Sequence, residues 1–304
     1  MLSINIPVYN IEVSDLVRQL KEQADTLSVD YDIRVYDDSS EEKFKERNRW
    51  VRELSNIIYL ELDKNIGRSA IRNKMGFDSK RRYQLFIDAD SRLVNDRFLK
   101  NYIEHAKSGC IISGGTSYSD SKPGDCEKML RWKYGRMREA VPAKIRAGKK
   151  GFIISSNNFF IESDLFKKIH FREEIISYGH EDTLLGFDLF NYGAEPLHID
   201  NPVEHTGIED SAVFLMKTRD AMKNLLFISK TAGTNASALK SRISFLNAYN
   251  MLTQVIPPSM IKWIFIRLSN VLESNLTGKN PQLFIFDLYK LGYYAQISLQ
   301  EINR

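Results

Sequence analysis

The amino-acid sequence predicts an α/β fold, with a Rossmann-like, mostly parallel sheet flanked by helices and a mostly helical C-terminal extension. Strand-like and helix-like hydrophobic patterns alternate through the first part of the chain, as in a parallel sheet whose crossover helices cover its faces. Polar and charged side chains follow directly after the predicted strands, where open α/β sheets bind their ligands. After Thr206 the strand pattern fades and helical spacing takes over.

The composition is that of an ordinary globular protein. Of 304 residues, 43% are hydrophobic and 27% are charged, which excludes disordered, collagen-like and low-complexity chains. Cys110 and Cys126 are too few for a disulfide framework and lack the CxxC spacing of a metal site. The strand pattern already begins at Leu2, which leaves no room for a secretory signal, so we expect a cytoplasmic protein. No apolar run is long enough to span a membrane.

Hydrophobic periodicity predicts the order of the elements. An alternating strand at the N-terminus precedes a long stretch with apolar residues at helical spacing. The predicted strands are residues 2–6, 31–36, 57–62 and 83–87, with a further strand-like segment at 196–199, and the predicted helices are residues 13–27, 44–54 and 69–79.

Asp88 and Asp90 stand at the end of the apolar strand at residues 83–87. Because strand side chains alternate, two carboxylates spaced two residues apart are expected to point to the same side of the sheet. There they can share one hard divalent cation, whose other ligands are water and phosphate oxygens. The alternative is that these residues cap the turn that follows the strand.

The ends of the first two strands predict a nucleoside site. Pro7 and Tyr9 offer a flat, largely apolar ledge, and a carboxylate of the pair Asp37 and Asp38 can accept the imide N–H of a uracil. The alternative is a pair of ordinary strand-to-helix turns.

A glycine turn at Gly67 leads into a helix N-terminus, where free N–H groups and the helix dipole favour an anion. Arg68 and Arg72 add positive charge that can face a diphosphate. The alternative is that both arginines lie on a helix surface.

Glu181 and Asp182 begin an amphipathic helix after Gly179. They are either first-turn charges that suit the helix dipole, or one of them is a general base that takes a proton from an attacking hydroxyl. A base must be ionised, and the helix N-terminus is consistent with a low pKa for Asp182. His205 is either structural or a metal ligand.

In this order, these motifs resemble the inverting glycosyltransferases of family 2, which have the GT-A fold. The matched stretch covers about residues 2–207, and the chain departs from the family pattern at Asp188, where many members have an arginine. The resemblance implies these roles: Pro7, Tyr9 and Asp38 hold the nucleoside; Asn65, Gly67, Arg68, Arg72 and Asn73 lie on the donor side; Asp88, Asp90 and His205 hold the metal; Asn158 lies beside the donor sugar; Glu181 and Asp182 form the catalytic acid pair, with Asp182 as the base.

The resemblance also implies the substrates and the cofactor. The donor is a nucleotide sugar, with a UDP-sugar expected, and the cofactor is Mn²⁺ or Mg²⁺. The acceptor is a hydroxyl of a glycan or lipid-linked saccharide, as in polysaccharide or cell-surface glycan synthesis.

Three other functions compare less well with the sequence. A nucleotidyltransferase shares a related core, but it typically has a glycine-rich phosphate loop where this chain has Pro7 to Asn10. An inactive scaffold that binds sugar nucleotides has no need of intact Asp88, Asp90 and Asp182. A nucleic-acid partner is disfavoured, because no RNA-recognition or helix-turn-helix pattern surrounds the basic residues.

The net charge of +4 is unevenly divided. Residues 211–304 contain 11 Lys and Arg against 4 Asp and Glu, a net charge of +7, and residues 1–210 contain 32 basic and 35 acidic residues, a net charge of −3. We therefore expect a catalytic domain over 1–210 and a basic helical region over 211–304.

This basic region contains a helix candidate after Pro257 in which Lys262 and Arg267 flank aromatic and aliphatic residues. That mixture suits contact with an anionic membrane surface, at the inner face of the membrane and near lipid-linked acceptors. The alternative is a helical subdomain that packs on the core or on a second subunit of a homo-oligomer.

Overall fold

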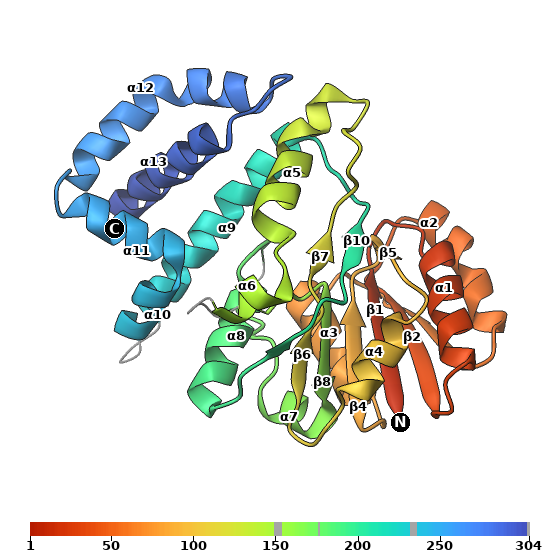
Figure 1. The fold of residues 1–304 in the computed structure, drawn as a ribbon. Coiled ribbons are helices and arrows are strands. Elements are labelled where there is room, and N and C mark those ends of the chain that lie inside the picture. The colour runs from red at the N-terminus through yellow and green to blue at the C-terminus, as the bar shows by residue number, and fades with distance from the viewer. Residues whose placement is uncertain (149–153, 176, 232–235, 303–304) are drawn as a thin grey trace.

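The computed structural model describes residues 1–148, 154–175, 177–231 and 236–302. Its main sheet has seven strands in the order β3-β2-β1-β4-β8-β6-β9 (Figure 1). These strands are β1 (Leu2–Val8), β2 (Tyr31–Asp37), β3 (Ile57–Glu61), β4 (Tyr83–Ile87), β6 (Ile111–Ser113), β8 (Asn158–Glu162) and β9 (Leu197–His198). Strands β1 to β4 are parallel, and β8 runs antiparallel to both β4 and β6. The predicted mostly parallel sheet is confirmed.

The strand order reverses between β1 and β4. The chain moves outward from β1 through β2 to β3 and then returns to place β4 on the other side of β1. At such a reversal the crossover helices diverge and leave a crevice at the carboxyl ends of the strands. The motifs that follow β1, β2 and β4 therefore meet at one edge of the sheet.

A second sheet of three short strands, in the order β5-β10-β7, lies next to this edge. Its strands are β5 (Ser91–Leu93), β7 (Thr116–Ser117) and β10 (Val203–His205). The antiparallel pairing of β10 with β5 sets His205 opposite Ser91, which brings the histidine beside Asp90.

Helices cover both faces of the main sheet. Those within residues 1–192 are α1 (Ser14–Asp25), α2 (Glu42–Asn48), α3 (Arg68–Asp78), α4 (Phe98–Glu104), α5 (Met129–Tyr134), α6 (Ala143–Gly148), α7 (Ser163–Lys168) and α8 (Glu181–Tyr192). One apolar cluster joins the sheet to α1 and α4, and a second joins it to α3, α7 and α8. The helix predicted over residues 44–54 is instead α2 followed by a 3₁₀ turn (Arg49–Glu53).

The predicted helical C-terminal region is confirmed. It comprises α9 (Ser211–Thr231), α10 (Ala236–Arg242), α11 (Ser244–Thr253), α12 (Pro258–Leu276) and α13 (Leu283–Ile302). These helices gather beside α5 and α8 (Figure 1) and share buried apolar clusters with them. Among the described residues, every helix is too short or too polar to cross a membrane.

Helix α12 buries one face and exposes the other. Phe265 packs edge-on against Tyr289 of α13, at a ring separation of 5.5 Å. The outer face of α12 consists of exposed residues at helical spacing: Met260, Trp263, Ile264, Arg267, Leu268 and Val271. This region thus packs on the α/β part of the chain, as one alternative expected, and still presents an apolar stripe to solvent.

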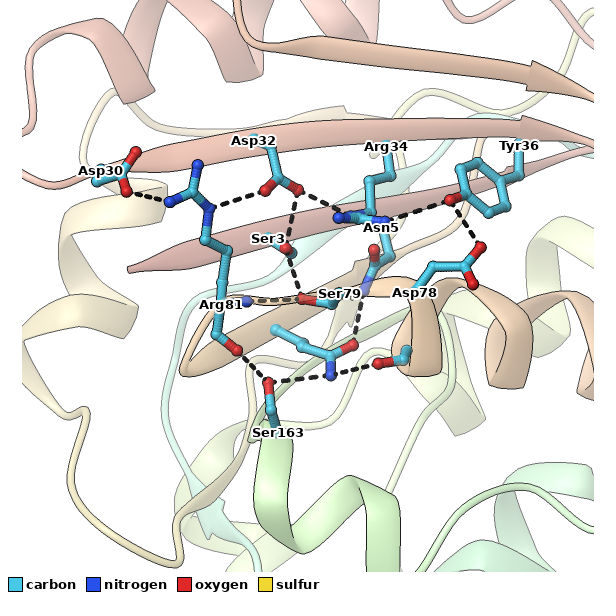
Figure 2. A network of polar contacts seen from close by, with 12 residues as sticks. Ser3, Asn5, Asp30, Asp32, Arg34, Tyr36, Asp78, Ser79, Arg81 and Ser163 are labelled. Atoms are coloured by element: carbon cyan, nitrogen blue, oxygen red, sulfur yellow. Dashed lines mark hydrogen bonds and ion pairs between the residues drawn. The ribbon is translucent and has the colours of Figure 1, made fainter.

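The polar positions of β1 are buried rather than exposed. Ser3 and Asn5 are fully buried, and their side chains join a network under α3 (Figure 2). Asp32 lies at its centre and accepts hydrogen bonds from Ser3, Arg34 and Arg81 at 2.8–2.9 Å. The alternation that predicts this strand therefore separates an apolar buried face from a hydrogen-bonded buried face.

Candidate active site

A cavity of about 480 Å³ lies beyond the carboxyl end of β4 and is lined from both the sheet and the C-terminal helices. Six predicted site residues line it: Arg68, Asp88, Asp90, Glu181, Asp182 and His205. Eight others do not: Pro7, Tyr9, Asp38, Asn65, Gly67, Arg72, Asn73 and Asn158. The cavity therefore unites the predicted metal and base residues, which come from distant parts of the sequence.

Asp88 is held by Arg72, which is 2% exposed. The arginine donates one hydrogen bond to Asp88 Oδ1 at 2.5 Å and another to the Arg68 carbonyl oxygen at 3.0 Å. Arg72 therefore does not face the cavity, contrary to the prediction that it meets a diphosphate. Strand alternation is also the wrong reason for the direction of Asp88 and Asp90, because both residues lie in the turn after β4.

Asp90 lies against His205. The imidazole Nδ1 is 3.3 Å from Asp90 Oδ1, and the Thr206 N–H donates to the Asp90 carbonyl oxygen at 2.8 Å. A Cβ at Gly207 would come within 2.4 Å of Asp90 Oδ2, so this close approach requires glycine. Burial favours the neutral acid, but His205 and Arg68 outweigh it and lower the pKa of Asp90.

These residues fit a divalent cation. Asp90 Oδ1 is buried and, apart from His205 Nδ1 at 3.3 Å, has no hydrogen-bond partner, and an ion or a water can satisfy a buried polar atom of this kind. Carboxylate and imidazole ligands suit Mn²⁺, and carboxylates also suit Mg²⁺. Asp88 lines the same cavity, with one of its two oxygens bonded to Arg72.

Another acidic cluster lies outside the cavity. Within the described part of the chain, Asp125, Glu127 and Asp210 form the set of acidic side chains whose ligand atoms all lie within 4.8 Å of one another. Asp125 also accepts the Glu127 N–H at 2.8 Å as the cap of a short helix. These contacts give the cluster a local structural role.

Glu181 and Asp182 enter the cavity at the start of α8. Glu181 Oε1 lies 3.8 Å from the Arg68 guanidinium, and Asp182 Oδ1 accepts the Thr183 N–H at 2.6 Å. Burial, and then the neighbouring Glu181 carboxylate, raise the pKa of Asp182 to about 7. The predicted low pKa is therefore wrong, because these two effects exceed the stabilisation from the Thr183 N–H.

The residues predicted to hold a nucleoside lie along the edge that leads to Arg68. The Asp38 carboxylate accepts the N–H groups of Ile66 and Gly67 at 2.7 and 3.0 Å, and burial raises its pKa. Asp38 thereby fixes the loop that precedes Arg68. Tyr9 is 56% exposed at the end of β1, and Pro7 and Asn65 flank the same edge. Their contact with a uracil remains a prediction.

Asn158 does not reach the cavity. It is fully buried and bonds Tyr102, the Gly115 carbonyl and the Asn201 carbonyl at 2.6–2.9 Å. These contacts give Asn158 a structural role behind the cavity wall, and its predicted place beside the donor sugar stays a prediction. Its neighbour Asn157, in the turn that precedes β8, lines the cavity together with Ser155 and Ser156.

The cavity also contains residues to which the sequence analysis gave no role. The Tyr178 ring lies between two cations, with the Arg68 guanidinium at 4.7 Å and the Lys217 ammonium at 5.1 Å. Tyr178 stands three residues before Glu181 in the sequence, and this proximity to the acid pair could have predicted that it lines the site. Further lining comes from the helical region and its contacts: Arg131, Phe214, Lys217, Phe245, Phe286 and Lys290.

Asp188, where the chain departs from the family pattern, lies outside this cavity lining. Both of its oxygens accept hydrogen bonds from Arg172, at 2.6 and 2.7 Å. At the position where many family members have an arginine, this chain therefore has an aspartate that forms an ion pair with Arg172.

The sheet order and the acidic residues at its carboxyl edge are those of a GT-A glycosyltransferase. The model of the family described as glycosyl transferase family 2 matches residues 3–169, and the chain belongs to this family. A search of curated proteins finds no match. Family membership supports glycosyl transfer rather than nucleotidyl transfer.

Solved structures with the same fold span nearly the whole chain. S. aureus TarS is 17% identical, with a TM-score of 0.55 over 98% of this chain and 55% of that chain. S. aureus TarS 1-349 in complex with UDP-GlcNAc is 16% identical, with a TM-score of 0.51 over 99% and 91%. The mannosyltransferase PcManGT from Pyrobaculum calidifontis, in complex with GDP-Man and Mn2+, is 12% identical, with a TM-score of 0.55 over 99% and 87%.

Proposed function

We propose that the chain is an inverting glycosyltransferase that moves a sugar from a UDP-sugar to a hydroxyl of a saccharide or lipid-linked saccharide. The observation that carries the proposal is that one cavity contains two carboxyl groups whose pKa values are shifted in opposite directions. Asp90, beside His205, has a lowered pKa, and Asp182, beside Glu181, has a pKa raised to about 7. Different environments suit different roles, and a group that titrates near neutrality suits a general base.

Asp182 accepts the proton of the acceptor hydroxyl in this proposal. The hydroxyl oxygen forms the new bond to the anomeric carbon while the bond to the diphosphate breaks on the opposite face, so the configuration inverts. The Arg68 guanidinium lines the cavity and offers fixed positive charge to the diphosphate as it leaves. Glu181, 3.8 Å from Arg68, orients that guanidinium.

Asp90, His205 and Asp88 would hold the divalent cation, which when bound supplies Lewis-acid stabilisation of the leaving diphosphate. Arg72 keeps one oxygen of Asp88 fixed through its bond at 2.5 Å. The nucleotide sugars and Mn2+ named with the similar structures support a donor and a cation of these classes.

The far part of the cavity suits an acceptor. Phe245 is partly exposed there, Phe214 and Phe286 are almost fully buried in the wall, and Lys217 and Lys290 offer hydrogen-bond donors. Flat apolar faces and hydroxyls alternate on a sugar ring, so a saccharide can use both kinds of contact. This part is built by α9, α11 and α13.

A donor panel tests the function. UDP-glucose, UDP-galactose, UDP-GlcNAc, UDP-glucuronate and GDP-mannose are each incubated with the chain and Mn²⁺, and nucleotide diphosphate release is measured with and without EDTA. Metal-dependent release of UDP from at least one donor is expected. Release from GDP-mannose alone would overturn the UDP assignment, and release from none would overturn the enzymatic function.

A further inference from the structure

The turn that delivers the acid pair is fastened to α9 by one side chain, that of Asn224. This asparagine is 9% exposed and lies in the helical region, outside the stretch that the family model matches. Its Nδ2 group donates to three successive carbonyl oxygens, those of Ser177, Tyr178 and Gly179, at 3.2, 3.1 and 2.9 Å. Its Oδ1 accepts the Ser177 hydroxyl at 2.8 Å.

The backbone of this turn needs such support. Gly179 and His180 both have left-handed φ angles, +97° and +70°, and a histidine adopts that region at a cost. Three adjacent carbonyls that lack N–H partners of their own would further destabilise the turn. The amide of Asn224 satisfies them from one position.

Helix α9 also approaches the turn closely at Ala221. A Cβ on Gly179 would come within 2.6 Å of the Ala221 Cβ and 3.2 Å of its Cα. Ala221 stands three residues before Asn224, so both lie on the same face of α9. The small side chains at Gly179 of the turn and Ala221 of α9 let the two segments approach closely. The Asn224 amide can therefore reach the carbonyl oxygens of residues 177–179.

The contact is coupled to the acid pair by position in the chain. Glu181 and Asp182 are the first two residues of α8 and follow Gly179 within three residues. His180, between Gly179 and Glu181, is the N-cap of the helix. Leu184 and Phe187 of α8 share a buried cluster with Met222 and Leu225 of α9. A shift of the turn relative to α9 would therefore move both carboxylates.

We propose that Asn224 is a positioning residue for glycosyl transfer, which sets the location of Asp182 through the backbone of residues 177–179. The inference rests on the proposed function and assigns part of the active site to the C-terminal helical region. Displacement of a catalytic group by about 1 Å can lower turnover about 100-fold, whereas nucleotide binding depends on other residues.

The test compares Asn224→Leu and the milder Asn224→Ser with a matched control, Ser229→Ala. Ser229 lies further along α9, is buried, and bonds the Leu226 carbonyl at 2.8 Å, away from the cavity. For each variant, kcat and KM are measured for metal-dependent UDP release, the UDP affinity is measured with Mn²⁺, and hydrogen exchange is followed at the amides of residues 180–184.

We expect Asn224→Leu to lower kcat about 10- to 100-fold, with the UDP affinity within about threefold of wild type. Asn224→Ser keeps one hydrogen-bond donor, so its kcat should lie between those of Asn224→Leu and wild type. Ser229→Ala should keep the wild-type kcat. Exchange at residues 180–184 should be faster in Asn224→Leu and unchanged in Ser229→Ala.

Unchanged kcat in folded Asn224→Leu and Asn224→Ser would overturn the inference, as would equal losses in kcat and UDP affinity. If Asn224→Leu does not fold, Asn224→Ser alone decides by the same criteria. If the wild-type chain releases no UDP, the proposed function fails. In that case hydrogen exchange at residues 180–184 still tests the contact: an unchanged rate in Asn224→Leu overturns it, and a faster rate supports it.

Discussion

Burial of the Asp182 carboxyl has a cost in stability that depends on pH. The folded chain holds the pKa of this carboxyl at about 7, above the ordinary value of 3.8, because burial and Glu181 disfavour its charge. The folded state therefore binds the proton more tightly than the unfolded chain does. Stability is lost as the pH rises from about 4 to about 7, and the full penalty remains at higher pH.

Asp182→Asn should therefore stabilise the chain, more so at pH 8 than at pH 4. The asparagine stays neutral at both values, whereas the carboxyl is charged at pH 8. Thermal unfolding at both pH values measures the difference in Tm between variant and wild type. A variant that is less stable than wild type at pH 8 would show that the carboxylate is not strained.

Asp90→Ala should remove the dependence of UDP affinity on the metal. In wild type, Mn²⁺ is expected to strengthen UDP binding at least about tenfold, which corresponds to about 1.4 kcal/mol. Titration calorimetry with UDP, in Mn²⁺ and in EDTA, measures the effect. Equal enhancement by Mn²⁺ in wild type and Asp90→Ala would remove Asp90 from the cation site.

At the scale of elements, the network under α3 supports the sheet at some distance from the chemistry. Asp32 and Arg34 have side chains that are 10% and 8% exposed and lie 2.9 Å apart. Arg81 adds a second cation on the same carboxylate, also at 2.9 Å (Figure 2). Loss of the carboxylate would leave the buried Arg34 without its counter-charge.

Asp32→Ala should accordingly destabilise the fold by about 3–5 kcal/mol, the usual cost of removing one partner of a buried ion pair. Asp15→Ala is the control, because the Asp15 side chain is 89% exposed and its pair with Arg18 contributes little. Urea unfolding measures both. Equal losses in the two variants would mean that the network does not stabilise the sheet.

The outer face of α12 gives the predicted membrane contact a definite surface. From residue 254 to residue 272 the charged side chains are Lys262 and Arg267, both basic. Trp263 is 58% exposed, with the Arg267 guanidinium 4.7 Å from its ring. Arg267 lies within this apolar stripe, and an exposed apolar stripe that carries a cation is complementary to an anionic lipid surface.

We therefore expect the chain to float with phosphatidylglycerol vesicles at low salt and to be released at high salt. Trp263→Ser should weaken binding, whereas Tyr192→Ser, at an exposed aromatic residue on α8, should not. If the vesicles do not bind the chain and sedimentation instead shows a dimer that Trp263→Ser dissociates, the stripe joins two copies and the membrane prediction is wrong.

The order of the strands and the positions of the acidic residues were predictable from the sequence, whereas the direction of individual side chains in the site was not. Strand periodicity located Asp88 and Asp90, because residues after parallel strands meet at one edge whatever the details of packing. Glu181 and Asp182 were located instead by the helical pattern that begins after Gly179. The choice between Asn157 and Asn158 was not predictable in this way, since Asn157 lies in the turn before β8 and Asn158 is bonded to Tyr102, Gly115 and Asn201, which are distant in the sequence.

Contacts between distant segments account for the rest. Arg72 pairs with Asp88 across 16 residues, and Asn224 bonds Gly179 across 45. Neither separation leaves a periodic signal in the sequence. The raised pKa of Asp182 also depends on burial by packed neighbours, which the helix-terminus argument does not include.

At the scale of the whole molecule, the charge division has a structural meaning. The predicted boundary at residue 210 falls directly before α9, yet the cavity contains residues from both sides of it, including Asp182 and Lys217. The basic region therefore lines the site proposed for glycosyl transfer. We expect it to determine which acceptor reaches Asp182.

The role of Asp182 is the central claim, and turnover of Asp182→Asn in metal-dependent UDP release tests it most directly. We expect a loss of about 10²- to 10⁴-fold in kcat, with the UDP affinity within about threefold of wild type. Asp188→Asn is the control, because Asp188 lies on the same helix, pairs with Arg172 and should leave turnover unchanged. An Asp182→Asn variant that binds UDP and keeps most of the wild-type kcat would contradict the account.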